Sequence, residues 1–504
     1  MADPGQRVLR LVLGNQLFPL EALSLDADTS VFMAEDLGLC TDFRHHQQKI
    51  VLFLAAMRGY RDELRSDGLQ VHYVELDTAD FRTFEEKLLP VLRETGAETL
   101  EYVEIEDEPM EARLDRFVNR HGLTSRVLRS PMFLTSRSEF ERFRAGRDQL
   151  RMAAFYKRQR RRLNVLIDDV GNPEGGRWSF DEANRKKLPR GLATPPRPRG
   201  SQNRHVRDVT ELVQRAFPDH PGNAKQFDWP TTRDDARRWL SIFIESRLGQ
   251  FGPFEDAIST ESPTVFHSLL SPLMNIGLLT PTEVLKAVED FVAKNDVPIE
   301  SLEGFYRQVI GWREFVRGVY REFGERQQST NFWGHERLLT EAWYRAETGI
   351  PILDDTIQLA LNDGWTHHIP RLMVVANLMT LCEIRPSDVH RWFMEMYVDS
   401  SEWVMGPNVY GMGIFSDGGI IVTKPYICGS NYLLKMSNYP RGDWCDVVDG
   451  LYWRFIDKHR QFFTSNPRLS LMVGALDRMD SDRRGRIFGV AETFLARVTE
   501  RSCR

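Results

Sequence analysis

The spacing of apolar residues changes once along the chain, and this change limits the folds that the chain can adopt. In the first part, short apolar runs of strand length alternate with segments of helical spacing. The strand-like runs are Val8–Gly14, Ser30–Ala34, Val71–Leu76 and Leu100–Ile105, and the helical segments are Gln47–Arg65 and Phe81–Gly96. Such alternation is typical of a parallel sheet with helices on both faces, so we predict an α/β, Rossmann-like domain here.

The rest of the chain has a different pattern. A basic run, YKRQRRR, follows Phe155, and residues 171–207 are rich in proline, glycine, arginine and lysine. From Val209 onward almost every segment has helical spacing, interrupted by prolines and by the glycine-rich stretch Met405–Gly419. We therefore predict an α/β domain over residues 1–150, a basic linker over 151–208 and an all-α domain over 209–504.

Composition and charge exclude several classes of protein. The chain has 504 residues, of which 27% are charged, and it contains neither a long apolar run nor an apolar leader after Met1. We therefore expect a cytoplasmic protein without a membrane partner. Its five cysteines are scattered without a C-x-x-C pair, which indicates reduced thiols. Because the formal net charge is −6, any contact with a polyanion must come from a local basic patch.

The densest polar cluster of the helical region is WTHHIPRLMVVAN, at Trp365–Asn377. Helical spacing would place Trp365, His368 and Arg371 on one face. A histidine beside a bound ligand is a plausible proton donor, whereas a structural histidine pair at a helix start explains the same residues. Adjacent histidines lack the i, i+4 spacing of a helical metal site, so no metal is predicted.

Two further clusters each allow two interpretations. Phe266–Thr280 places hydroxyl side chains around a proline next to an expected helix start, which suits either a phosphate group or ordinary capping. Phe305–Tyr320 combines aromatic residues with arginines at helical spacing. That pattern is typical of a core face with a solvated basic face, and it is also compatible with a functional site.

Together these segments resemble, in order and wording, the flavin-binding helical domain of photolyases and cryptochromes. The motifs are HSLLSPLMNIGLL at His267–Leu279, IGWREFVRG at Ile310–Gly318, WTHHIPRL at Trp365–Leu372 and HRWFMEMYVDSSEWV at His390–Val404. LVLGNQL at Leu11–Leu17, HHQQK at His45–Lys49, GGRWSFDEANR at Gly175–Arg185 and the segment Gly411–Tyr439 resemble the prokaryotic (6-4) photolyases in particular. The resemblance covers essentially the whole chain.

The resemblance implies a photolyase fold, with FAD buried in the helical domain beneath a basic DNA-binding cleft. The residues that would line the FAD diphosphate are His267, Ser268, Leu270 and Ser271. Those at the edge of the FAD and lesion pocket would be Trp312, Arg313 and Glu314, and those at the isoalloxazine Arg371, Asp399 and Asn408. The candidates for contact with DNA are His367 and the basic residues Lys157, Arg158, Arg160, Arg161 and Arg162.

The activity implied is repair of (6-4) pyrimidine photoproducts, in which excited FADH⁻ lends an electron to the flipped lesion. His368 would supply the proton, and Tyr426 would hydrogen-bond the lesion. Photoreduction of the flavin would begin at Trp392 and continue through Tyr344 or Trp343. The route differs from that of the relatives, because Phe393 stands where they carry a tyrosine.

Two departures from the family concern further cofactors. Most prokaryotic (6-4) photolyases bind a four-iron cluster through four cysteines. Here Cys445 matches one ligand position, but Ile352 replaces another and Tyr439–Gly442 replaces the C-x-x-C pair, so we expect no iron–sulfur cluster. For an antenna chromophore, a ribityllumazine or another, Asn15 and Leu39 occupy two usually acidic positions and Glu35 remains, which leaves its presence and identity open.

Three alternatives remain at this point. A cryptochrome-type photoreceptor would share the fold and the FAD, although the short tail after Phe494 favours repair. Repair of cyclobutane dimers would call for asparagine at His368. A helical nucleic-acid module without chemistry would leave the tryptophan and histidine clusters unexplained. The expected partner is UV-damaged DNA, and we expect a monomer.

Overall fold

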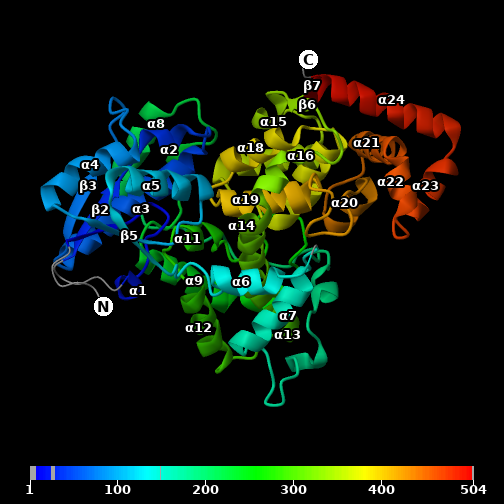
Figure 1. The fold of residues 1–504 in the computed structure, drawn as a ribbon. Helices are drawn as coiled ribbons and strands as arrows, with labels where there is room; N and C mark the ends of the chain where they lie inside the picture. Colours follow the sequence, from blue (N-terminus) through cyan, green and yellow to red (C-terminus); the bar gives the residue numbers. More distant parts are fainter. Residues whose placement is uncertain (1–6, 24–28, 148, 502–504) are drawn as a thin grey trace.

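The computed structural model describes residues 7–23, 29–147 and 149–501, which form an α/β part and a larger helical part (Figure 1). The α/β part is built on one parallel sheet with the strand order β3-β2-β1-β4-β5. The strands are β1 (Val8–Leu11), β2 (Ser30–Ala34), β3 (Gln70–Val74), β4 (Thr99–Val103) and β5 (Thr124–Leu128). Strand β5 was not predicted, because it is an edge strand whose residues are mostly exposed and form no apolar run.

Side chains alternate between the two faces of the sheet, so each face has its own helical layer. On one face, Val31 and Met33 of β2 belong to the core that includes α3 (Gln47–Ser66). On the other, Phe32 packs with α4 (Phe84–Thr95) and α5 (Glu108–His121). The predicted α/β class of the first part is therefore confirmed.

Local capping signals determine both ends of α4. Thr83 and Glu86 form a capping box at its start, and Gly96 ends it with a φ of 61°. The helix predicted over Phe81–Gly96 therefore begins at Phe84, because Thr83 takes the N-cap position.

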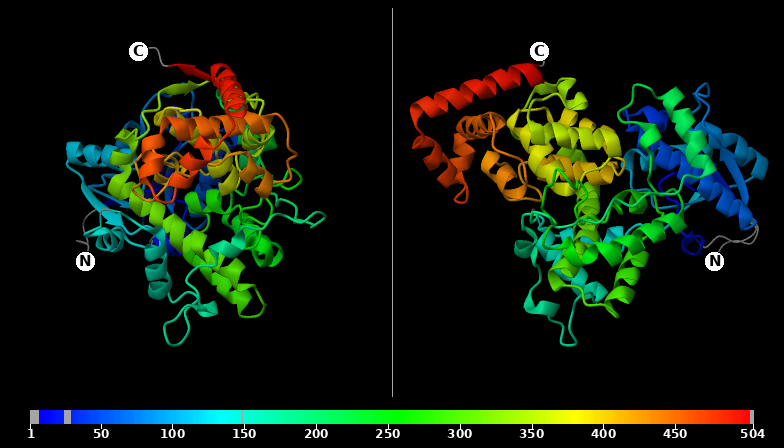
Figure 2. Two further views of the ribbon diagram at one scale, coloured as in Figure 1. Left: turned by 90° about the vertical axis from the view of Figure 1, so that its right-hand side faces the viewer. Right: turned by 180° about the vertical axis from the view of Figure 1, so that it is seen from behind.

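The second part is helical, as predicted, apart from one small sheet. The elements that carry residues of the candidate site described below are α11 (Ser271–Asn275), α14 (Glu314–Ser329), α18 (Pro386–Met396), α19 (Glu402–Gly406) and the π-helical η4 (Arg307–Arg313), η5 (Pro370–Ala376) and η6 (Pro407–Gly413). Strands β6 (Arg337–Leu339) and β7 (Thr499–Arg501) pair antiparallel, so the end of the described chain returns to the helical part (Figure 2). No helix of the described residues is long and apolar enough to cross a membrane.

The remaining helices complete both parts. They are α1 (Leu20–Leu23), α2 (Leu37–Thr41), α6 (Arg137–Arg144), α7 (Met152–Leu163), α8 (Arg204–Ala216), α9 (Arg233–Ser246), α10 (Leu248–Phe251), α12 (Pro281–Val292), α13 (Ile299–Tyr306), α15 (Ala342–Arg345), α16 (Pro351–Asp363), α17 (Asn377–Leu381), α20 (Ser430–Met436), α21 (Trp444–Lys458), α22 (Arg460–Ser465), α23 (Ser470–Asp477) and α24 (Ser481–Val498). Three short 3₁₀ turns add η1 (Glu174–Gly176), η2 (Asp181–Asn184) and η3 (Ala224–Gln226).

The boundary between the two packed parts does not lie at residue 150. The ring centroids of Phe143 on α6 and Phe155 on α7 lie 5.1 Å apart, and those of Phe155 and Phe315 on α14 lie 5.7 Å apart. The chain therefore joins the helical core before residue 150. In the opposite direction, α8 packs against α3 of the α/β part. The limits at 150 and 208 therefore cut across packed units, although residues 165–203 hold only η1 and η2, as the linker composition indicated.

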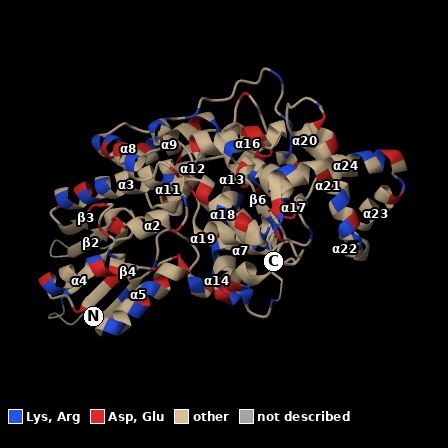
Figure 3. Cartoon of the chain, turned by 90° about the horizontal axis from the view of Figure 1, so that it is seen from above, with Lys and Arg blue, Asp and Glu red and all other residues tan. Residues whose placement is uncertain are grey.

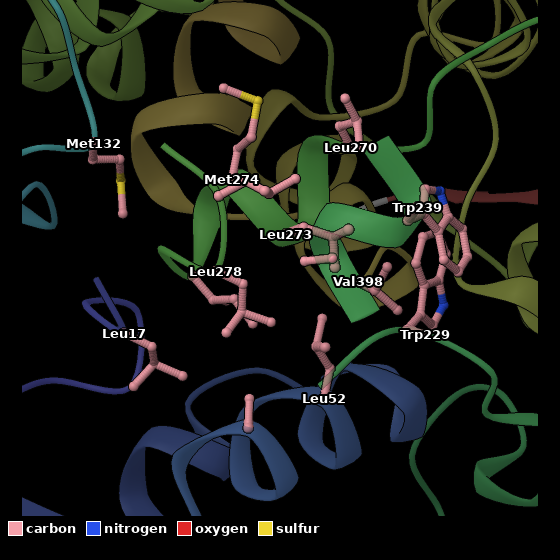
Figure 4. Close-up of a cluster of buried hydrophobic side chains, with 14 of the residues drawn as sticks. Leu17, Leu52, Met132, Trp229, Trp239, Leu270, Leu273, Met274, Leu278 and Val398 are labelled. Atoms are coloured by element: carbon pink, nitrogen blue, oxygen red, sulfur yellow. The ribbon is translucent and has the colours of Figure 1, made fainter. Parts of the chain in front are cut away.

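One apolar cluster joins the α/β part to the helical part (Figure 4). Leu17 and Leu52 from the α/β part lie in it with Leu273 of α11. The rings of Trp229 and Trp239 stack in the same cluster, with centroids 5.6 Å apart. Because burial of apolar surface contributes roughly 25 cal/mol per Å², this contact fixes the α/β part against the loop that leads into α11.

Candidate active site

A bidentate ion pair joins η5 to the turn that follows α18. Arg371 donates from Nη1 and Nη2 to the two carboxylate oxygens of Asp399, at 2.9 and 3.1 Å. Ser271 Oγ donates to Asp399 Oδ2 at 2.6 Å, and the guanidinium lies 3.9 Å from the centre of the Tyr397 ring. The structure thus brings together three residues predicted to hold the cofactor, Ser271, Arg371 and Asp399, from three separate segments.

The loop that leads into α11 has a strained backbone. Val265 and Leu269 have positive φ angles of 42° and 56°, in a region that residues other than glycine rarely adopt. Such strain costs on the order of 1–3 kcal/mol per residue and gathers at ligand-binding loops. Ser268 and Leu270, predicted to line the diphosphate, lie in this loop directly before Ser271.

Three histidines gather beside this loop, with ring nitrogens within 4.8 Å of one another. His267 and His367 are buried and stack at 4.4 Å, and His267 Nε2 is hydrogen-bonded to the Glu255 carbonyl at 3.0 Å. Desolvation, and then neighbouring positive charge, hold the pKa of each ring well below its ordinary value. The prediction that His367 contacts DNA is wrong for this structure, because its buried ring cannot reach a phosphate group.

His368 differs from its neighbours in both exposure and charge. Its side chain is 47% exposed, and its Nε2 lies 3.3 Å from Asp256 Oδ1. Desolvation lowers the pKa of His368, but the hydrogen bond and charge of Asp256, together with the charge of Glu255, outweigh it and raise the pKa above its ordinary value. His368 therefore keeps its proton to higher pH than an ordinary histidine does.

Tyr426 is half-buried in the same region. Burial raises the pKa of its phenol, and the charges of Asp181 and Asp256 raise it further. Tyr426 is therefore a neutral hydroxyl near the aspartate that partners His368, and it can donate a hydrogen bond.

Sequence reasoning missed Asp256. The residue lies in the stretch FGPFEDAIST, in which no regular spacing is visible, and it is 112 positions away from His368. Its only signal is its place shortly before the motif that begins at His267. The fold alone reveals the contact.

The predicted helix face of Trp365, His368 and Arg371 is wrong in one respect. Trp365 lies in the connection before the helix, and from Pro370 onward the helix has π geometry. A π turn spans one residue more than an α turn, so α-helical spacing does not apply. Arg371 still lies 6.0 Å from the Trp365 ring, but the contact runs across the connection and not along a helix.

Glu314 does not line a pocket as predicted. It is buried, and its two oxygens accept the backbone N–H groups of Leu134 and Thr135 at 2.9 and 2.8 Å. Its carboxylate therefore anchors the segment between β5 and α6 to the helical part. Trp312, two positions earlier on η4, is half-buried, and its role at a pocket edge stays a prediction.

Each of the three π-helical segments carries a predicted site residue: Trp312 on η4, Arg371 on η5 and Asn408 on η6. π-Helical turns are frequent at functional sites, because they move one side chain out of the α-helical register. Asn408 Nδ2 donates to the Val404 carbonyl at 2.8 Å, within its own helix. Its contact with a flavin stays a prediction.

The predicted redox residues lie close together. Trp392 on α18 is fully buried, and its Nε1 donates to the Trp343 carbonyl at 3.0 Å. Tyr344 follows Trp343 directly. The ring of Tyr397, which sequence reasoning did not single out, lies 5.8 Å from Trp392 and also contacts Arg371. A chain of aromatic rings thus reaches the ion pair.

The basic residues of α7 divide into two roles. Lys157 and Arg161 lie over the ring of Trp178, at 4.6 and 4.8 Å, and stay accessible. Arg160 is fully buried and donates to four backbone carbonyls of the linker, so its prediction as a DNA contact is wrong. Lysine and arginine positions are interspersed with aspartate and glutamate positions along the chain in Figure 3, so any contact with DNA must rest on a local patch.

The residues predicted to hold an antenna have other contacts. Glu35 accepts hydrogen bonds from Arg58 Nε and Nη2, from the Tyr73 hydroxyl and from the Leu76 N–H, at 2.7 to 2.9 Å. Four donors fill the acceptor positions of a carboxylate. Glu35 was predicted to hold a chromophore, but it has no acceptor position left for one. Asn15 is half-buried in the turn after β1. A cleft of about 860 Å³ opens beside α4 and α5.

The positions that matter for an iron–sulfur cluster lie in an apolar core. Cys445 and Ile352 are both buried in it. The cysteines of the described chain, Cys40, Cys382, Cys428 and Cys445, are buried free thiols that form no disulfide, and Cys503 lies outside the described residues. The absence of a cluster stays a prediction from the sequence.

Comparisons with known proteins agree with this arrangement. Residues 10–229 match the family described as deoxyribodipyrimidine photo-lyase-related protein, and residues 305–423 match the FAD binding domain of DNA photolyase. A (6-4) photolyase of Agrobacterium fabrum (strain C58) is 34% identical over 97% of this chain and 99% of its own length.

Two solved structures share the fold. A bacterial class III photolyase from Agrobacterium tumefaciens superposes with a TM-score of 0.57 at 17% identity, covering 98% of both chains. A Synechocystis sp. PCC6803 cryptochrome superposes with a TM-score of 0.58 at 13% identity, covering 98% of this chain and 99% of that one. Together with the full-length similarity to the (6-4) photolyase of Agrobacterium fabrum, these findings show that the chain belongs to the photolyase and cryptochrome family and carries its FAD-binding domain.

Proposed function

We propose that this protein repairs (6-4) pyrimidine photoproducts in DNA in a reaction driven by blue light, with His368 as the proton donor. The observation that carries the proposal is the Asp256–His368 pair, a half-exposed histidine with a raised pKa, three residues from Arg371. The similarity to a protein named (6-4) photolyase supports the choice of lesion.

The residues around the Arg371–Asp399 pair fit FAD. The strained loop with Ser268 and the hydroxyl of Ser271 suits a phosphate group, and the ion pair offers a fixed polar edge. His367 Nδ1 is buried and has no hydrogen-bond partner among the described residues, which favours a ligand beside it. When bound, FAD would supply the electron that starts repair and would take it back at the end.

The protein's own part is to hold the lesion and move one proton. Asp256 pairs with Nε2 and keeps His368 protonated, His368 donates the proton of its other ring nitrogen, Nδ1, to the lesion, and the proton returns when repair is complete. Tyr426 hydrogen-bonds the lesion as a neutral phenol. A damaged base pair has already lost stacking and pairing energy, so flipping it out of the helix costs less than flipping a normal base.

The direct test uses purified protein with FAD, a defined oligonucleotide that carries one (6-4) photoproduct, and blue light. Chromatography should show restored pyrimidines in the illuminated sample and none in the dark. An oligonucleotide with a cyclobutane dimer serves as the matched control and should stay unchanged. Absence of repair despite bound, photoreducible FAD would contradict the proposal and favour a photoreceptor.

A further inference from the structure

A buried lysine of the α/β part reaches the segment that carries Asp399. Lys49 lies in the first turn of α3 and is buried. Its Nζ lies 2.9 Å from Ser400 Oγ and 3.1 Å from His45 Nδ1. Burial of a charged amine is costly unless it makes hydrogen bonds, so these contacts indicate a specific role for the lysine.

Ser400 holds the turn that follows α18. Its hydroxyl lies 2.8 Å from the carbonyls of Met394 and Tyr397, so it can donate to either one while it accepts from Lys49. The preceding residue is Asp399, whose side chain pairs with Arg371. Lys49 therefore braces this turn from the other part of the molecule.

Several charges face Lys49 from the surrounding elements. Acidic groups come from the end of α2, the start of α5, the turn after α18 and the start of α19, and His45 adds a titratable ring. The acidic residues are Asp42, Asp107, Asp399 and Glu402. Burial lowers the pKa of Lys49 to about 8, although these carboxylates oppose the shift. The amine can thus lose its proton in a mildly alkaline solution.

We propose that Lys49 is a positioning residue for the Arg371–Asp399 pair, and that it acts through Ser400 from the α/β part of the molecule. The inference rests on the proposed FAD site, because it assigns to Lys49 the orientation of a residue of that site. A protonated amine donates a stronger hydrogen bond than a neutral one and offsets the nearby carboxylates. FAD should therefore bind more weakly once Lys49 loses its proton.

The test measures the FAD dissociation constant in the dark, without DNA, between about pH 6.5 and 9.5. For the parent protein, the constant should rise as pH passes through about 8. Lys49→Met should weaken FAD binding on the order of tenfold at neutral pH and should abolish this rise. Lys49→Arg keeps the charge and does not titrate in this range, so it should bind FAD tightly with a flat profile.

Gln47→Leu is the matched control. Gln47 is buried in the same turn of α3, but it donates to the Phe217 carbonyl and not to Ser400. It should keep the parent's pH profile. If Lys49→Met does not fold, Ser400→Ala tests the same contact and should weaken FAD binding in the same way.

The proposal would be overturned if Lys49→Met or Ser400→Ala bound FAD with the affinity and pH profile of the parent protein. It would also be overturned if Gln47→Leu lost as much FAD affinity as those variants. Because no lesion or light is used, this outcome is independent of whether the protein repairs DNA.

Discussion

The charge of His368 depends mainly on the hydrogen bond and charge of Asp256, with a further contribution from the charge of Glu255. Without the hydrogen bond and charge of Asp256, only the charge of Glu255 would oppose desolvation and the positive charge of Arg307, so the pKa of His368 should fall. A proton donor works only while it is protonated, so repair should decline as pH rises through its pKa. In Asp256→Asn this decline should move to lower pH. The measurement is repair per bound FAD as a function of pH.

Glu261→Gln is a suitable control for this prediction, because Glu261 is an exposed carboxylate of the same loop. It should leave the pH profile unchanged. A profile of Asp256→Asn that matches the parent would mean that Asp256 does not set the charge of His368.

At this scale the sequence predicts residue types well and their surroundings poorly. Arg371 and Asp399 were both identified by motif as candidates for the cofactor site, and the structure joins them in an ion pair. Arg160, Glu35 and His367 were assigned to ligands, but each is buried and the first two are engaged by their own chain. Burial depends on which segments pack together, and no local pattern reveals that.

The predicted electron route begins on α18, which holds Trp392 against Trp343. Trp392→Phe should block photoreduction of bound FAD, because phenylalanine is not oxidised under these conditions. It should also lower the free energy of unfolding by about 1 kcal/mol, through the lost N–H donor. Absorbance of the flavin during illumination measures the first effect.

Trp403→Phe is the control, because Trp403 is a buried tryptophan whose Nε1 has no partner among the described residues. It should photoreduce like the parent. Normal photoreduction in Trp392→Phe would remove that residue from the electron route.

The two roles of α7 lead to a paired prediction. Lys157→Ala with Arg161→Ala should weaken binding to DNA and reduce the slope of log K against log salt by about 1 per lost phosphate contact. Arg160→Ala should instead lower the free energy of unfolding by about 2–4 kcal/mol, because buried carbonyls lose their donor. Salt titrations and denaturant unfolding measure the two effects. Unchanged salt dependence in the double variant would contradict the assignment.

Elements with strong periodicity or clear caps were predictable, and irregular ones were not. Strands β1 to β4 follow from short apolar runs and α4 from its helical spacing, and the capping box at Thr83 marks where α4 begins. The edge strand β5 and the π-helical η5 do not, because exposed strands lack an apolar run and a π turn leaves no sequence signature. The error at Trp365 came from extending helical spacing to a residue that lies in the connection before the helix.

On the scale of the whole molecule, two parts share one interface cluster around Leu52 and Leu273. The class of each part was predictable from the change in periodicity. The actual division was not, because α6 and α8 each pack on the part opposite to the one their position suggests. The packing of α6 and α8 on the opposite part arises from contacts between segments that are distant in the sequence.

The cofactor content is a property of the whole protein. With Ile352 and the Tyr439–Gly442 loop in place of cluster ligands, purified protein should contain FAD and less than stoichiometric iron. Iron and acid-labile sulfide analysis against FAD content measures this. Four iron atoms and four sulfides per FAD would contradict the prediction.

The role of His368 as the proton donor is tested by the quantum yield of (6-4) repair per bound FAD, in the parent and in His368→Ala. The quantum yield of the variant should fall by about 10²–10⁴-fold, with FAD content and photoreduction nearly intact, because only the proton donor is removed. If His368 had only a structural role, stability and FAD retention would fall together while repair per FAD stayed the same. A variant that repairs as well per FAD as the parent would contradict the account.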